Sequence, residues 1–141
     1  RPDEANLVDE LRHAGLTTLS LVAELDGRVV GHVLFSPMGV EPPMISAVGL
    51  GPLAVAPDLP GRGICYRLVR QGVPECPRRR FDSIFLLGSP RSYSRFGFEL
   101  VAGRCVTSNQ PPAHFQYIEM WEGAVGAVPL TVRYSPQFDR F

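Results

Sequence analysis

Apolar and polar residues follow one another in blocks along the chain, and the first block predicts a helix. Residues 3–14 carry apolar side chains at helical spacing, among them Leu7 and Leu11, with polar residues between them. The segment opens with acidic residues, which suit the positive end of a helix dipole, and Gly15 follows it as a helix end. We therefore expect an amphipathic helix over residues 3–14.

The next two blocks predict a β-hairpin. Residues 18–25 and 28–36 are apolar runs separated by Asp26-Gly27, a dipeptide that favours a tight hairpin turn. Both runs carry apolar side chains at successive positions, and so on both faces of the strands. We therefore expect this sheet to be covered on both sides.

The middle of the chain predicts a strand, a helix and a second strand. After a loop expected at residues 39–46, the apolar run at residues 48–56 predicts a strand. Residues 63–73 suit a helix, which Pro74 should end because proline lacks the backbone N–H and clashes with the preceding turn. The apolar run within residues 82–89 predicts a central strand.

The last third of the chain predicts a short helix and two strands. The helix begins at Pro90 and ends near Gly97. Residues 114–121 and 129–134 are β-rich, and we expect them to pair with each other. The succession of strands and helices predicts an α/β fold with a mixed sheet.

Composition and charge narrow the class of protein. A chain of 141 residues suits one domain that spans residues 1–141. The formal net charge is zero, which provides no general attraction to nucleic acid or to anionic lipid. No apolar run approaches the ~20 residues that a membrane span requires. We expect no nucleic-acid partner and no membrane partner, and we expect the arginines at positions 78–80 in a solvated loop.

The cysteines indicate a reducing compartment. Cys65, Cys76 and Cys105 form an odd set without a Cys-x-x-Cys pair, which disfavours both zinc binding and disulfide stapling. Two histidines, His13 and His114, have no metal-ligand partner at a useful spacing. We therefore expect three reduced thiols, a cytoplasmic location and no metal.

The junction between the strand at residues 48–56 and the helix at residues 63–73 has the pattern of an anion site. Gly61 and Gly63 lie where the helix should begin, and no acidic side chain accompanies them. The first N–H groups of a helix have no partner within it, and glycine lets an anion approach them closely. The Lys-Ser/Thr pair of a P-loop and the third glycine of a dinucleotide fingerprint are missing. Two glycines alone are equally typical of a tight helix start.

Four segments together resemble the GNAT family of N-acetyltransferases. The stretch "PGRGIC" at residues 60–65 aligns with the family's Q/R-x-x-G-x-G/A motif, and "YSRFGF" is similar to its Tyr-x-x-x-Gly-Phe element. The stretch "SLVAELDGRVVGHVLFSP" resembles the family's antiparallel arms, and "LGPLAVAPDL" resembles its bulged fourth strand. The resemblance is greatest to a branch of small bacterial acetyltransferases and covers roughly residues 2–138. It implies a mixed, mostly antiparallel sheet with helices on both faces, in which the family's first strand and first helix have no counterpart before Arg1.

The resemblance also implies a co-substrate and the residues that contact it. Acetyl-CoA would lie between the strands at residues 48–56 and 83–88. The implied contacts are Leu53, Ala54, Val55, Gly61, Arg62, Gly63, Ile64 and Cys65. Tyr93 occupies the position of the family's general acid, which protonates the leaving thiolate. Reference pKa values of ~10 for a phenol and ~8.5 for a thiol make that proton transfer nearly balanced.

The implied reaction is direct attack of a primary amine on the thioester, and the amine must first lose a proton. The candidate bases are Glu24, His32, Glu41 and Glu119. The acceptor pocket is expected from residues 39–47 and 104–126, which hold few acids, so a polycationic acceptor is disfavoured. A small-molecule amine and a peptide amine both stay open as acceptors. A homodimer stays open as well, because family members often dimerise.

Three departures from the family pattern favour an alternative function. Pro60 stands where the motif opens with Gln or Arg, Cys65 stands at its last small position, and Pro74 shortens the helix. A domain that keeps the fold but has impaired catalysis would serve as an acyl-CoA sensor or as a protein-interaction module. Binding without turnover would distinguish that alternative from an enzyme.

Overall fold

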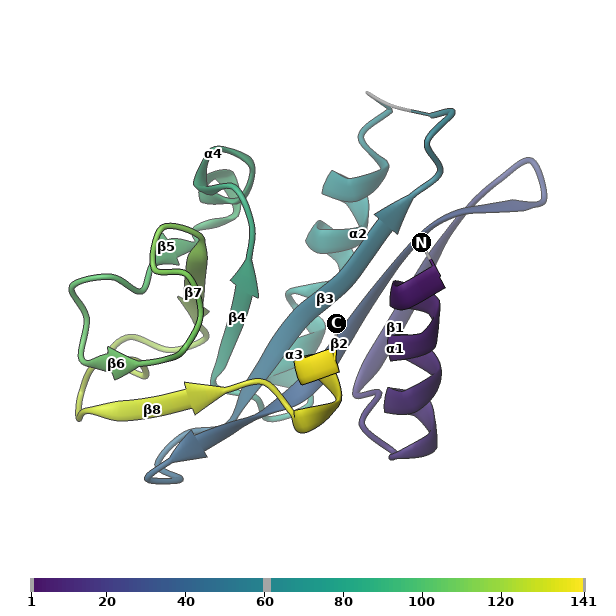
Figure 1. Ribbon diagram of the computed structural model, residues 1–141. Helices are drawn as coiled ribbons and strands as arrows, with labels where there is room; N and C mark the ends of the chain where they lie inside the picture. The colour runs from purple at the N-terminus through teal and green to yellow at the C-terminus, as the bar shows by residue number, and fades with distance from the viewer. Residues whose placement is uncertain (1, 60–61, 141) are drawn as a thin grey trace.

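The computed structural model describes residues 2–59 and 62–140 (Figure 1). The elements are, in chain order, α1 (Pro2–His13), β1 (Leu19–Leu25), β2 (Arg28–Glu41), β3 (Ala47–Val55), α2 (Ile64–Gly72), α3 (Glu75–Arg78), β4 (Ser83–Leu87), α4 (Pro90–Tyr93), the 3₁₀ helix η1 (Ser94–Phe96), β5 (Glu99–Leu100), β6 (Val106–Thr107), β7 (Phe115–Glu119), β8 (Leu130–Arg133) and the 3₁₀ helix η2 (Pro136–Arg140). The predicted helices and strands therefore all form. The predicted loop at residues 39–46 is shorter than expected, because β2 continues to Glu41.

One mixed sheet holds the strands of the described residues together. Its order is β5-β7-β4-β3-β2-β8-β6, with β1 paired to β2 beside this path. The β3–β4 and β6–β8 pairs are parallel. The remaining pairs are antiparallel, as the family resemblance implied.

Helices cover both faces of the sheet (Figure 1). Alternate residues of β2 point to opposite faces, so each face presents apolar side chains to a helix. Leu34 packs with Leu7 and Leu11 of α1 on one face. Val33 and Phe35 belong to the main core on the other face, which α2 covers with Leu68 and Val69. No helix among residues 2–59 and 62–140 is long and apolar enough to cross a membrane.

The hairpin of β1 and β2 is less well covered than its apolar pattern indicated. Val22 and Val29 are each 56% exposed, and Leu25 is exposed beside them. The prediction of a sheet covered on both sides is therefore wrong for this corner. The physical reason is that the buried leucines of α1 pack on Leu34 of β2 and not on the outer strand β1.

The two strands of the tail do not pair with each other, and the prediction that they do is wrong. β7 pairs with β4 and β5. β8 instead pairs with residues 39–41 of β2 and with β6. Each strand gains a neighbour that a hairpin would not provide, and each buries its apolar side chains in one core with Phe85.

Candidate functional site

The first feature of the site is an open edge on β3. β3 and β4 pair at only three positions, from Ala47↔Ser83 to Gly49↔Phe85. Beyond Gly49 the two strands diverge, as Figure 1 shows. A shift of register in the β2–β3 pairing lies at the same level, and such bulges bend a strand. The backbone of residues 50–55 therefore has no strand partner on its β4 side within the described chain.

The second feature is the uncapped start of α2. Gly63 precedes the helix with φ 69°, a left-handed conformation that glycine adopts without steric cost. No side chain caps the helix, and its first turn holds no acidic residue. The first N–H groups of α2 therefore have no partner within the helix and favour an anion. Pro60 and Gly61, which belong to the predicted motif, lie outside the described residues.

Cationic groups flank this helix start. Arg62 is exposed immediately before Gly63. The guanidinium carbon of Arg95 lies 4.4 Å from the centre of the Tyr66 ring, in the first turn of α2. Sequence reasoning missed Arg95, although it lies inside the "YSRFGF" element. Together these arginines add positive charge at the point where the helix dipole already attracts an anion.

Tyr93 lies at the end of α4 and faces Cys65 in the first turn of α2. Its ring packs edge-on against Phe98, with the ring centres 6.1 Å apart. Burial and, to a smaller extent, the neighbouring Cys65 thiol together raise the pKa of Tyr93 to about 12. Burial also raises the pKa of Cys65, against the opposing effects of Arg95 and of a hydrogen bond with Tyr93. The expectation of a nearly balanced proton transfer to a thiol is therefore corrected, because the phenol in this structure is a weaker acid than a free one.

A cleft of about 590 Å³ lies between the diverging strands, and Tyr93 is among the residues that line it. Its lining residues are Glu4, Leu7, Leu50, Gly51, Pro52, Leu53, Leu87, Tyr93, Gln110, Tyr134, Phe138 and Asp139. We call it the central cleft. The cleft brings together Leu53 and Tyr93, which were predicted as site residues from the sequence. Gln110, Tyr134 and Asp139, which were not individually predicted, line it as well.

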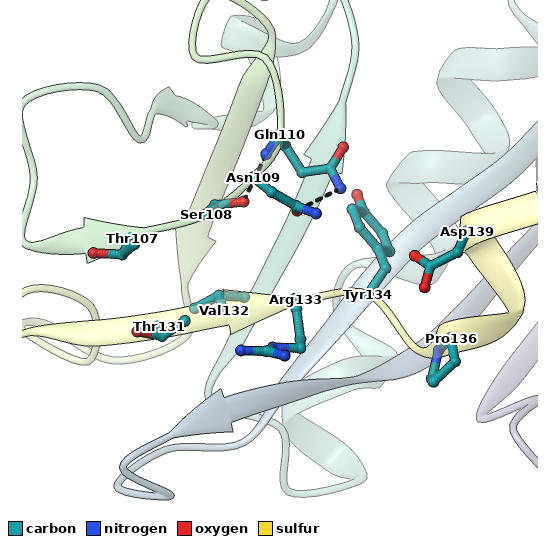
Figure 2. Close-up of a pocket in the computed structure, with 10 residues that line it drawn as sticks. All are labelled: Thr107, Ser108, Asn109, Gln110, Thr131, Val132, Arg133, Tyr134, Pro136 and Asp139. Carbon is teal, nitrogen blue, oxygen red and sulfur yellow. Dashed lines mark hydrogen bonds between the residues drawn. The ribbon is translucent and has the colours of Figure 1, made fainter.

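A second pocket, of about 440 Å³, adjoins the central cleft (Figure 2). Its lining residues are Thr107, Ser108, Asn109, Gln110, Thr131, Val132, Arg133, Tyr134, Pro136 and Asp139. We call it the polar pocket. It shares Gln110, Tyr134 and Asp139 with the central cleft, so the two cavities meet at these side chains.

None of the four candidate bases lines either cavity. The Glu119 carboxylate accepts hydrogen bonds from the backbone N–H groups of Gly123 (2.8 Å) and Val125 (3.1 Å), and so holds a turn. His32 lies 3.3 Å from the Ser20 hydroxyl, and burial lowers its pKa. Glu24 and Glu41 are exposed on β1 and β2.

The walls of the two cavities come only partly from the loops that the sequence indicated. Residues 107–110 lie within the expected segment 104–126, but residues 39–47 line neither cavity. Residues 131–139 were missed, because the expected tail hairpin placed them elsewhere. In the part of the chain that the structure describes, no three His, Cys, Asp or Glu side chains gather in a way that could hold a metal ion.

Comparisons of the sequence and of the structure with known proteins both point to the acetyltransferase (GNAT) family. Residues 2–98 match the model of the acetyltransferase (GNAT) family. The chain is 38% identical to the uncharacterized N-acetyltransferase YhbS of Escherichia coli strain K12, over 98% of this chain and 84% of that protein.

Two crystal structures show the same arrangement of elements. One is a GNAT family N-acetyltransferase (YhbS) from Escherichia coli in complex with CoA, with a TM-score of 0.90 and 38% identity, covering 99% of this chain and 79% of the other. The second is a GNAT family acetyltransferase from Brucella melitensis in complex with acetyl-CoA, with a TM-score of 0.80 and 34% identity, covering 97% of this chain and 79% of the other.

Proposed function

Because the chain belongs to the acetyltransferase (GNAT) family, we propose that it transfers the acetyl group of acetyl-CoA to a primary amine. The observation that carries this proposal is the path that the open edge of β3 offers between the uncapped start of α2 and the central cleft, which Tyr93 lines. The complexes of similar proteins with CoA and with acetyl-CoA support the same co-substrate here.

The two ends of this path suit the two ends of the cofactor. The diphosphate would accept hydrogen bonds from the N–H groups that follow Gly63, with Arg62 and Arg95 adding charge. The pantetheine amides would pair with the free backbone of residues 53–55 in the manner of an added β-strand. The thioester would then reach the central cleft, which Leu53 of β3 and Tyr93 of α4 both line.

The reaction needs one bond to form and one to break. The amine, after loss of one proton, attacks the thioester carbon, so that a C–N bond forms and the C–S bond then breaks. A backbone N–H of β3 would stabilise the oxyanion. Tyr93 would give its proton to the leaving sulfur and regain one from the nitrogen through solvent. The net products are an acetamide, CoA and one proton.

The raised pKa of Tyr93 determines its role in the proposed reaction. With a pKa of about 12, the phenol keeps its proton throughout the physiological range. It is therefore a permanent hydrogen-bond donor that would stabilise negative charge on sulfur as the C–S bond breaks. Full proton transfer would follow only when the sulfur carries most of that charge.

The test combines binding with turnover. A thermal melt with acetyl-CoA at ~100 times its Kd should stabilise the protein by about 2.7 kcal/mol. CoA release, followed with a thiol reagent, should depend on an added amine. A melting shift without amine-dependent release would support the alternative of a binding-only domain. The Cys65 thiol beside Tyr93 is a structural feature that fits that alternative. No shift at millimolar acetyl-CoA would overturn both.

A further inference from the structure

We infer that the polar pocket is the acceptor site, and that its substrate is a small amine with a single ammonium group and several hydroxyl or amide groups. This inference rests on the proposed function. The pocket meets the central cleft at Gln110, Tyr134 and Asp139, so a molecule held in it has its reactive end toward the thioester. A volume of about 440 Å³ suits a small molecule rather than a protein segment.

Several uncharged hydrogen-bonding groups stand among the apolar parts of the pocket's walls. They include the hydroxyls of Thr107, Ser108 and Thr131 and the amides of Asn109 and Gln110. Gln110 N donates to the Ser108 hydroxyl (3.1 Å), and the Gln110 amide donates to the Asn109 side-chain oxygen (3.2 Å), so this wall is ordered before a ligand arrives. Figure 2 shows both bonds as dashed lines. These groups can pair with hydroxyl or amide groups on a ligand.

One aromatic side chain, that of Tyr134, is shared by the two cavities. Tyr134 packs against Phe138 at a tilt, with ring centres 4.9 Å apart. Its ring also lies against Gly49 of β3, where a Cβ atom would come within 2.6 Å of the Tyr134 Cε1 atom. Tyr134 is therefore fixed between β3 and η2, and the boundary between cofactor and acceptor is rigid.

Two charges of opposite sign determine which amine fits. Asp139 is exposed on η2 and lines both cavities, whereas Arg133 lines the polar pocket alone. The two side chains form no ion pair with each other or with another residue of the described chain. The carboxylate can therefore hold one ammonium group at the mouth of the central cleft. The exposed guanidinium of Arg133 would repel a second ammonium group in the polar pocket.

The first test removes the charge of Asp139. Asp139→Asn should raise the KM for the amine at least ten-fold, while the KM for acetyl-CoA changes less than two-fold. Asp139→Glu should recover most of the loss. The matched control is Asp9→Asn, the same chemical change on the exposed face of α1, which should behave as the wild type. An unchanged amine KM in Asp139→Asn would overturn the inference.

The second test compares three probe amines. Glucosamine carries one ammonium and several hydroxyl groups, spermidine carries several ammonium groups, and phenethylamine carries one ammonium on an apolar body. Glucosamine should have the highest kcat/KM by at least ten-fold, and Arg133→Glu should raise the kcat/KM of spermidine. Preference for spermidine or phenethylamine in the wild type would overturn the inference, and so would acetylation of none of the three.

Different results would overturn the proposed function and the inference about the acceptor. If the melting temperature does not respond to acetyl-CoA, the proposed function fails and takes the inference with it. If acetyl-CoA stabilises the protein and amines are acetylated, but with the wrong preference or without dependence on Asp139, only the inference fails.

Discussion

The ring of Tyr93 lies against Gly88, so closely that a Cβ atom at position 88 would come within 2.5 Å of the Tyr93 Cε2 atom. Gly88 directly follows β4, and Tyr93 ends α4. The absence of a side chain at one end of this short connection thus determines where the phenol lies at the other. The position of Tyr93 in the central cleft depends on this contact.

Replacement of Gly88 should displace the phenol without unfolding the protein. In Gly88→Ala the new methyl group would push the Tyr93 ring away, and we expect kcat to fall roughly ten-fold or more, because an ångström of misplacement is costly in catalysis. Acetyl-CoA affinity, measured by thermal shift, should change little. The control is the same substitution in a Tyr93→Phe background, where it should lower kcat much less. An equal loss in both backgrounds would mean that Gly88 acts by another route.

Tyr93→Phe keeps the ring and its contact with Phe98 but removes the hydroxyl. We expect kcat to fall about 10²-fold, the low end for a proton donor, with the KM for acetyl-CoA unchanged. Because the pKa of Tyr93 is about 12, the wild type should show no loss of kcat up to pH 10 from ionisation of this phenol. Steady-state kinetics from pH 6 to 10 checks both points. Equal turnover by the two proteins would remove Tyr93 from the mechanism.

The start of α2 provides a test of the anion site. Asp and Asn both tolerate the left-handed conformation of Gly63 and both cap helices, but only Asp is charged. Gly63→Asp should bind acetyl-CoA at least ten-fold more weakly than Gly63→Asn, a difference of about 1.4 kcal/mol or more. The melting temperatures of the two proteins without ligand should be similar. Equal affinity, measured by calorimetry, would show that the diphosphate lies elsewhere.

His32 should make the protein less stable in acid. Burial first, and the charge of Arg12 second, lower its pKa in the folded state below the ordinary value near 6.5. The unfolded chain therefore binds a proton more readily, so stability falls as pH drops below ~6.5. Between pH 7.5 and pH 5, the melting temperature of His32→Gln should fall by less than that of the wild type. His13→Gln, on the exposed end of α1, is the control, and a parallel loss in all three proteins would refute the role of His32.

Local patterns determined the elements of this protein. The apolar spacing in α1, the Asp26-Gly27 turn and Pro74 each act within a few residues, so the sequence was sufficient to locate them. The glycine turn before α2 and the place of Tyr93 also follow from neighbouring residues. For that reason these parts of the candidate site could be predicted, and the family with them.

Only the tertiary structure decided which distant segments meet. Contacts between residues far apart in the chain determine the partners of β7 and β8 and form the pocket that Arg133 and Asp139 line. They also place Glu119 away from the site. The acidity of Tyr93 depends on them as well, because burial and a neighbouring thiol raise its pKa. Hydrophobic burial selects such contacts for the whole chain at once, and no short stretch of sequence contains that information.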